Sequence, residues 1–413
     1  MKEYKKLLKN REFVLYSIGQ AFSQFGDRLV QIVLIGYVYK RWPGSTFQLA
    51  KLFSITVLPS FILSPIAGVF VDRWDRKKVM LISDVLRAVL VLLVPIFILS
   101  TESILPLYAA LFLIFSAACF FLPAKFAIIP RLVPKEDILV ANSASSIVWV
   151  ISGIAGFSLG GILAEWAGLK NSLYANAAVY GLSATSFLIL FHASKTKTFE
   201  PGPVKKETFL RDLSIGLKTL ITDRNARLVA GLFFTLASLI GLIYVVGVVF
   251  VQETLKSMTK YVGLFGMFLF IGILAGSYGY GRVGPKLSKT KTVSTSLILM
   301  GISILTFSLG LAFTGSIRLG GAAMFFLGLF IAPVYITANT VIHESIEHKL
   351  GGRIFSSLGI VMNTGFLIFM LVSSRLAENM NKMTMLLFCG FCFIIVGSLS
   401  FLAGGLKRTI SSS

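Results

Sequence analysis

The feature that most restricts the fold of this chain is its succession of long apolar stretches. A helix that crosses the hydrocarbon core of a bilayer needs about 20 mostly apolar residues. Twelve such stretches can be placed along the 413 residues. We therefore predict an all-α integral membrane protein with twelve transmembrane helices. They are expected near residues 13–39, 47–71, 79–99, 105–127, 140–164, 173–192, 226–252, 261–281, 292–314, 319–341, 354–374 and 384–405.

The composition agrees with a membrane protein. Hydrophobic residues make up 55% of the chain and charged residues 14%, whereas a soluble domain carries about a quarter charged residues. The first 11 residues, MKEYKKLLKNR, have the basic character of a signal-peptide start. The apolar stretch that follows is too long for a signal peptide and contains Asp27 and Arg28, so we expect it to be retained as the first span.

The distribution of basic residues predicts the orientation of the chain. If the N-terminus is cytoplasmic, the segments on that side carry 28 of the 39 Lys and Arg residues, and the outer segments carry 9. This asymmetry follows the positive-inside rule. It predicts a protein of the bacterial inner membrane with both termini on the cytoplasmic side. The formal charge of +21 is then explained by basic residues that contact anionic membrane lipids. We therefore expect no nucleic-acid partner.

One long polar segment divides the spans into two groups of six. Within it, Glu207 to Ile221 combines apolar residues at helical spacing with charges on the opposite face, which predicts a helix on the inner membrane surface. The predicted domains are an N-terminal six-helix bundle over 1–192, a cytoplasmic linker with this amphipathic helix over 193–225, and a C-terminal six-helix bundle over 226–413.

Two landmarks recur in both halves at nearly the same offset. Arg73 and Arg282 each follow an apolar span and lie 209 positions apart, and Pro123 and Pro333 lie 210 positions apart near the ends of the fourth and tenth spans. This repetition indicates a duplicated unit, so we expect two pseudo-symmetric six-helix bundles. Duplicated halves with a binding site at mid-membrane are a common design of secondary transporters.

The stretch GVFVDRWDRKK, after the second span, resembles a signature loop of the major facilitator superfamily, G-x-x-x-D-R-x-G-R-[KR]. Asp75 stands where the pattern has its second glycine. The strings LPAKFAIIPRLVPKEDILVANS and HKLGGRIFSSLG are similar to the branch that contains macrolide and siderophore exporters, and to bacterial lysophospholipid transporters. The matching loop residues are Gly68, Asp72, Arg73, Arg76 and Lys77.

The resemblance implies that the loop residues control conformation. A carboxylate at the membrane edge can pair with neighbouring cations in one conformation and release them in another. The family pattern implies that Asp72 latches the halves with Arg73 or Arg76, with Asp84 or Arg87 in the same network. The alternative is that the cations of this loop, Lys77 among them, only fix topology and bind lipid headgroups.

The fifth predicted span is rich in glycine. Gly153, Gly156, Gly160 and Gly161 are spaced by one to four residues. Small residues at such intervals allow close packing of helix backbones. The resemblance implies a glycine-rich fifth helix of the kind found in exporters, although the usual Gly-Pro pair is absent; helix packing alone is the other interpretation.

A polar stripe crosses the first predicted span. Gln20, Gln24, Asp27, Arg28 and Gln31 fall within an arc of about 100° on a helix. A charge at the bilayer centre costs about 2.5–3.5 kcal/mol, so this stripe must face the bundle interior or water. Because neighbouring side chains diverge by about 100°, we expect Asp27 and Arg28 to have separate partners.

These residues are the main candidates for substrate binding and coupling. A carboxylate that is alternately exposed to water and enclosed can switch between its protonated and ionised forms, which is the minimum requirement for proton coupling. Asp27 could also hold a cationic substrate, and Arg28 an anionic headgroup. The alternative is a buried ion network that fixes helix packing without meeting a substrate.

The predicted function is a proton-coupled exporter that moves amphipathic small molecules by alternating access. The alternatives are a lysophospholipid flipping transporter, a divalent-metal exporter, or a membrane enzyme. The chain contains no HExxH motif, no paired catalytic carboxylates and no GxxxxGK[ST] loop, so we predict that it is not an enzyme and needs no cofactor.

The expected partners are substrate, protons and membrane lipids, and the expected state is a monomer. No metal site is predicted, because His343, Glu344, Glu347 and His348 are expected in an inner loop.

Overall fold

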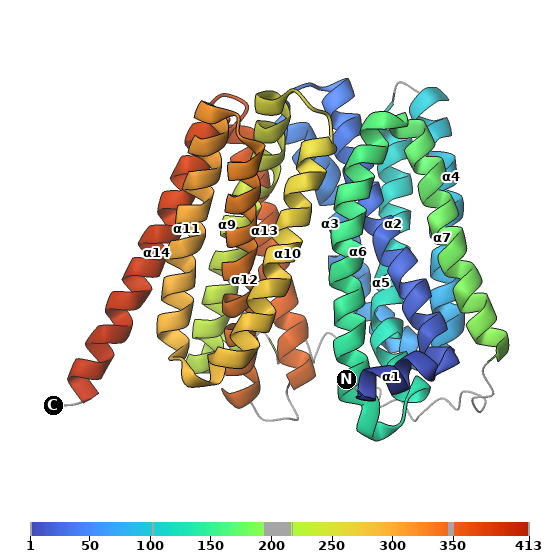
Figure 1. The fold of residues 1–413 in the computed structure, drawn as a ribbon, viewed down its shortest axis with the longest axis horizontal. Coiled ribbons are helices and arrows are strands. Elements are labelled where there is room, and N and C mark those ends of the chain that lie inside the picture. Colours follow the sequence, from blue (N-terminus) through green and yellow to red (C-terminus); the bar gives the residue numbers. More distant parts are fainter. Residues whose placement is uncertain (1, 101–102, 194–215, 217, 346–350, 412–413) are drawn as a thin grey trace. The chain divides into compact units, whose positions relative to one another are not determined.

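The structure, a computed structural model, describes residues 2–100, 103–193, 216, 218–345 and 351–411 (Figure 1). In these ranges the chain is helical, with twelve helices of at least 24 residues, a short helix at the N-terminus and two short 3-10 helices. The elements are α1 (Lys2–Lys9), α2 (Arg11–Arg41), α3 (Thr46–Arg73), α4 (Arg76–Ser100), α5 (Leu105–Leu132), η1 (Lys135–Asp137), α6 (Ile138–Trp166), α7 (Gly168–Ala193), α9 (Arg224–Leu255), α10 (Lys260–Val283), η2 (Gly284–Lys286), α11 (Lys289–Thr314), α12 (Ile317–Ser345), α13 (Gly351–Leu376) and α14 (Lys382–Ser411).

Hydropathy explains most of these helices. Within the described ranges, eleven helices are long and apolar enough to cross a membrane. The exception among the twelve long helices is α2, whose 31 residues include the polar stripe of Gln20, Gln24, Asp27, Arg28 and Gln31. Its position in the bundle therefore depends on partners from other helices, because its own hydropathy is insufficient.

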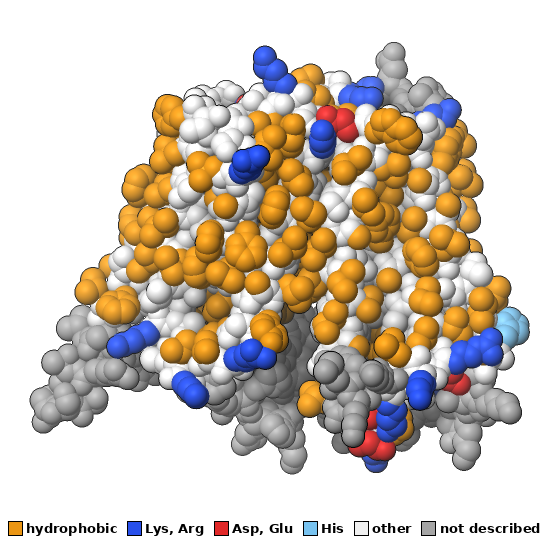
Figure 2. All heavy atoms as spheres, viewed as in Figure 1, with side chains coloured by type: hydrophobic (Ala, Val, Ile, Leu, Met, Phe, Trp, Pro, Cys, Tyr) orange, Lys and Arg blue, Asp and Glu red, His pale blue; other side chains and the backbone are white. Residues whose placement is uncertain are grey.

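The face of the molecule shown in Figure 2 has the surface of a membrane protein. Hydrophobic side chains cover the middle of the helices, and Lys and Arg side chains gather toward their ends. This arrangement places apolar side chains against lipid and charged side chains near the headgroups. The fold is that of an integral membrane protein.

The chain divides into two compact units, the first comprising residues 1–37 and 52–207, and the second comprising residues 38–51 and 208–413. The same helix pairing occurs in both. In the first unit, α4 packs against α5 and α7; in the second, α11 packs against α12 and α14. These are the third, fourth and sixth long helices of each half. The predicted duplication is thus visible in the packing. The helix predicted at 207–221 lies mostly outside the described residues.

The repeated sequence landmarks also fall on equivalent helices. Arg73 ends α3 and Arg282 lies one residue before the end of α10, which are the second long helices of their halves. Pro123 and Pro333 lie inside α5 and α12, the fourth helices. Both prolines are accommodated within continuous helices, as is common when neighbouring helices surround the affected turn.

Candidate functional site

The centre of the first unit holds a charged cluster built around Arg87. The Arg87 side chain is fully buried on α4. Its guanidinium donates to Asp27 Oδ1 on α2 at 2.8 Å and also pairs with Asp84 Oδ1, one turn away on α4. Since a buried charge is tolerated only when it is paired, these three side chains must be considered as one unit. We call Asp27, Asp84 and Arg87 the buried triad.

Hydroxyl groups add further hydrogen bonds to the buried triad. Ser23 donates to Asp84 Oδ1 at 3.1 Å and accepts from Arg87 at 2.9 Å. Ser183 of α7 donates to Asp84 Oδ2, and the Tyr180 hydroxyl donates to Asp27 Oδ1 at 2.7 Å. The network therefore connects α2, α4 and α7.

Aromatic rings enclose the guanidinium. The Arg87 Cζ atom lies 4.8 Å from the centroid of the Phe121 ring and 4.9 Å from that of Tyr180. A guanidinium over an aromatic face gains a favourable cation–π interaction, which is larger where water is excluded. Arg87 is thus held by two carboxylates and two rings in a site that excludes solvent on the α4 side.

The members of the buried triad differ in their access to solvent. The Arg87 and Asp84 side chains are fully buried, whereas the Asp27 side chain is 22% exposed. With two carboxylates and one guanidinium, the triad carries a formal excess of one negative charge. Lys125 of α5 interacts electrostatically with Asp27 and offsets this charge, and Asp27 is the member of the triad that a proton or a cationic group from solvent can reach.

Arg28 lies on a different side of α2. It donates to Gln31 Oε1 at 3.1 Å, and its Cζ atom lies 5.8 Å and 5.7 Å from the ring centroids of Trp149 and Phe157 on α6. Gly156 makes room for it, because a Cβ there would lie 2.6 Å from the Arg28 Cβ. Asp27 and Arg28 are adjacent in sequence but contact different helices.

The glycines of α6 form part of this contact. Gly153, Gly156, Gly160 and Gly161 are all buried, and a Cβ on Gly160 would lie 3.1 Å from a Leu29 side-chain carbon. At least two of the four therefore bring α6 close to α2, as small residues do in membrane helix pairs.

The glutamines at the start of the polar stripe connect helices. Gln20 is fully buried; its Nε2 donates to the Ser145 carbonyl at 2.8 Å, and its Oε1 accepts from the Ser145 hydroxyl at 2.8 Å. The Gln24 side chain is also buried. Gln20 thus holds α2 against α6, which is a positioning contact at this end of the stripe.

The loop residues have a separate environment. The surroundings of Gly68 lie outside what the structure describes, as do the side chains of Asp72, His343, Glu344, Glu347 and His348. Arg73 is exposed, and Arg76 and Lys77 are partly buried. Asp84 and Arg87 were expected in this loop network, but the structure places them with Asp27. Arg87 is 11 residues beyond Arg76, which is about 16 Å along α4.

Three important residues were not selected from the sequence. Tyr180 and Ser183 face the triad from α7, and their only sequence signal is helical spacing, which many core residues share. Lys125, near the end of the span predicted over 105–127, lies inside α5 with only 4% exposure and interacts electrostatically with Asp27. A lysine between apolar residues in LPAKFAII was the available signal.

One further polar side chain lies next to the triad. Asn176 is fully buried one turn before Tyr180 on α7, and its amide has no hydrogen-bond partner within the described ranges. A Cβ added at Gly26 would lie 3.0 Å from its Oδ1. A buried amide of this kind normally binds water or another polar group. It extends the polar site along α7.

The second unit contains an apolar pocket of about 200 Å³ between α9, α11, α12 and α13. Its walls are mainly aromatic, aliphatic and methionine side chains, with the amide of Asn363 as a polar group. Tyr335 is 56% exposed and stacks edge-on against Phe233 at 6.0 Å between ring centroids. Such a lining suits an apolar or aromatic part of a ligand. Within the described ranges, no group of three His, Cys, Asp or Glu side chains could hold a metal ion.

Comparisons with known proteins agree with this architecture. The model of the Major Facilitator Superfamily matches residues 16–369. Macrolide efflux protein A of Streptococcus pyogenes is 24% identical over 94% of this chain and 95% of its own length. Multidrug resistance protein MdtG of Proteus mirabilis is 27% identical over 79% and 78%. A crystal structure of a POT family transporter in complex with 5-aminolevulinic acid superposes with a TM-score of 0.75 at 14% identity, covering 95% of this chain and 96% of that one.

Proposed function

Because the chain belongs to the major facilitator superfamily and is therefore a membrane transporter, we propose that it exports amphipathic small molecules in exchange for protons. The observation that carries the proposal is the buried triad, whose partly exposed carboxylate can accept a proton. Export, rather than uptake, is favoured by the names of the efflux and multidrug resistance relatives.

The unequal solvent access of the two carboxylates supports proton coupling. Arg87 keeps both carboxylates in place, while only Asp27 has access to solvent. Protonation of Asp27 would weaken its ion pair with Arg87, and the hydroxyl of Tyr180 would then lose its ionised acceptor. A proton thus changes how α2, α4 and α7 are held together, which is a physical route from proton binding to helix movement.

The two units provide chemically different contacts for a cargo. The partly exposed Asp27 offers a polar group in the first unit, and the aromatic pocket with Asn363 offers apolar surface in the second. An amphipathic molecule carries groups that suit each of these contacts taken by itself. A lysophospholipid has the same amphipathic character and is the alternative cargo, with Arg28 as a possible contact for its phosphate.

The accompanying assignments are also proposals. We assign both termini to the cytoplasmic side of a bacterial plasma membrane, because basic residues are concentrated in the segments expected on that side. The junction of α3 and α4, with Asp72 and Arg73 at the end of α3 and Arg76 at the start of α4, acts as a latch between conformations. The bundles extend over 1–192 and 226–413, and the working unit is a monomer.

The test is transport by the Asp27→Asn variant in proteoliposomes with an imposed proton gradient. Macrolide antibiotics and cationic dyes serve as cargoes, and a fluorescent lysophospholipid is a separate arm. We expect Asp27→Asn to lose gradient-driven transport while folding normally, because Asp84 still neutralises Arg87. Asp223→Asn is the matched control: Asp223 caps α9, and asparagine caps a helix equally well.

Full gradient-driven transport by Asp27→Asn would exclude this residue from coupling. Movement of the lysophospholipid alone would favour the alternative cargo.

A further inference from the structure

A long groove runs along the first unit between α4 and α5, away from the buried triad. Its volume is about 1080 Å³, at the upper limit of the roughly 300–1,000 Å³ typical of small-molecule sites. The groove is lined by the loop after α3, by α4 and α5, and by Phe191 of α7. Its size and position raise the question of which molecule occupies it.

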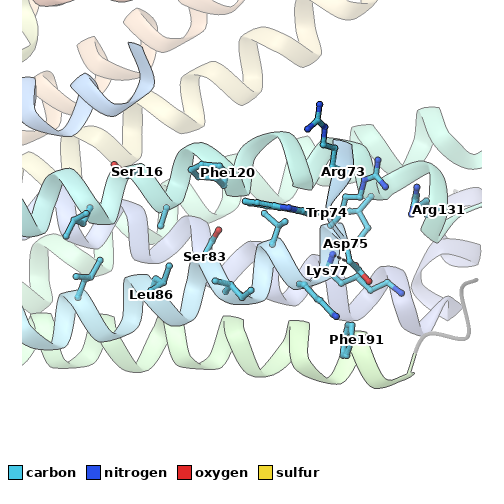
Figure 3. Close-up of a pocket in the computed structure, with 18 residues that line it drawn as sticks. Arg73, Trp74, Asp75, Lys77, Ser83, Leu86, Ser116, Phe120, Arg131 and Phe191 are labelled. Atoms are coloured by element: carbon cyan, nitrogen blue, oxygen red, sulfur yellow. Dashed lines mark hydrogen bonds between the residues drawn. The ribbon is translucent and has the colours of Figure 1, made fainter. Parts of the chain in front are cut away.

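The two ends of the groove differ in chemistry (Figure 3). At one end lie five cations and one carboxylate, contributed by Arg73, Asp75, Arg76, Lys77, Lys78 and Arg131. The remainder is lined by aliphatic and aromatic side chains, and several of them, such as Ile82, Leu86 and Leu113, are about half exposed. The groove therefore has an anion-attracting mouth and an apolar body.

The mouth leads into the apolar part past two aromatic rings. Trp74 and Phe120 lie nearly parallel, with 6.2 Å between ring centroids and 22° between planes (Figure 3). Trp74 is 47% exposed, which is typical of tryptophan at the level of lipid headgroups. This ring marks the boundary between the charged and the apolar part of the groove.

The length of the groove matches one leaflet. From Lys78 to Leu90 the wall extends 12 residues along α4, or about 18 Å. Half of the roughly 30 Å hydrocarbon core is about 15 Å. A molecule with an anionic head at the mouth would thus have its acyl chains at the depth of the surrounding lipid.

We propose that this groove is a binding site for an anionic phospholipid, with the phosphate held by Lys78 and Arg131 and the acyl chains along α4 and α5. Lys78 and Arg131 are both exposed and approach the mouth from different helices. The charge surplus of the mouth selects an anionic head over a zwitterionic one. Because the loop after α3 forms the mouth, the bound lipid would also order this loop. The inference does not depend on the proposed cargo or on proton coupling.

Brominated lipids provide a direct test, because bromine quenches tryptophan fluorescence on contact and Trp74 lies in the groove. The protein is reconstituted in vesicles that contain brominated phosphatidylglycerol or brominated phosphatidylcholine. The quenching due to Trp74 is obtained by comparison with the Trp74→Phe variant. We expect Trp74 to prefer the anionic lipid about 25-fold, since each of the two cations that hold the phosphate contributes roughly a five-fold preference and the two factors multiply.

Removal of the two phosphate contacts should abolish this preference. In the double variant Lys78→Gln/Arg131→Gln, the ratio should fall to within about two-fold of unity. The double variant Lys289→Gln/Lys291→Gln removes an equal charge from the start of α11, outside the groove, and should keep the wild-type ratio. Thermal unfolding in detergent checks that both variants are folded. Equal quenching by the two lipids in the wild type, no quenching of Trp74, or the same loss in both double variants would each overturn the proposal.

Discussion

The two units share a helix pairing, but the contacts between helices inside each unit are of different kinds. The helices of the first unit contain Asp27, Arg28, Asp84, Arg87 and Lys125 in their interiors. In the second half, the ranges 228–252, 261–281, 292–314, 319–341, 354–374 and 383–402 contain no Asp, Glu, Lys or Arg. A duplicated architecture can therefore be maintained with an ionic centre in one copy and none in the other.

Glycine takes the place of the ionic contacts in the second unit. A Cβ at Gly272 or Gly276 of α10 would overlap a backbone carbonyl of α12, and a Cβ at Gly328 would overlap one of α10. Helices that are not joined by ion pairs can associate in membranes by such close backbone approach. The first unit thus depends on charge pairing across α2, α4 and α7, and the second depends on shape.

The largest effect is expected at Arg87. The Arg87→Met substitution leaves Asp27 and Asp84 without their cation, and breaking a buried ion pair from one side destabilises by about 3–5 kcal/mol. Thermal unfolding in detergent should show the loss. Adding Asp27→Asn and Asp84→Asn to the same chain should restore much of it, because no uncompensated charge remains. Arg282→Met, in the second unit, should change the free energy of unfolding by less than about 0.5 kcal/mol. A stable Arg87→Met protein would contradict the ionic basis of the first unit.

A smaller effect on stability is expected when one tyrosine in each unit is replaced by phenylalanine. Tyr180 donates to the carboxylate of Asp27, and Tyr280 of the second unit is hydrogen-bonded to the neutral hydroxyl of Thr337; both distances are 2.7 Å. Hydrogen bonds to charged groups contribute about 1.5–3 kcal/mol and neutral ones about 0.5–1.5 kcal/mol. Tyr180→Phe should therefore lower the unfolding temperature more than Tyr280→Phe. Equal losses in the two variants would show that the charge of Asp27 does not strengthen this contact.

The smallest of the three effects concerns the glycines of α10. Gly272→Ala forces a methyl group against the Phe325 carbonyl, and overpacking of this kind costs about 1–3 kcal/mol. Gly279→Ala on the same helix meets open space and should have little effect or be slightly stabilising. Denaturation of both variants under one set of conditions makes the comparison. If Gly272→Ala were as stable as Gly279→Ala, close backbone approach would not be what holds the second unit.

The transmembrane architecture could be predicted from the sequence because hydropathy is a local property. The predicted spans overlap all twelve long helices, and the offset of Arg73 from Arg282 indicated the duplication correctly. The polar stripe on α2 was also visible, since its five residues recur with the period of a helix. The partners of the stripe were not visible, because contacts such as Arg87 with Asp27 join residues 60 positions apart.

Two placements differed from expectation for a physical reason. The family resemblance grouped Asp84 and Arg87 with the loop, yet they extend into the bundle, where Asp27 and Ser183 provide partners. Lys125 was not expected to approach Asp27, because lysine is rarely buried. Its burial depends on the aromatic and charged neighbours that only the folded bundle provides.

The low hydropathy of α2, compared with the other long helices, has a consequence for biosynthesis. Because α2 precedes α4 in the chain, it leaves the ribosome with Asp27 before Arg87 has been synthesised. Each charge at mid-helix disfavours insertion by about 2.5–3.5 kcal/mol. During that interval α2 must remain near water, headgroups or the insertion machinery. Its final entry into the bilayer therefore follows the synthesis of α4, and the order of assembly is not the order of translation.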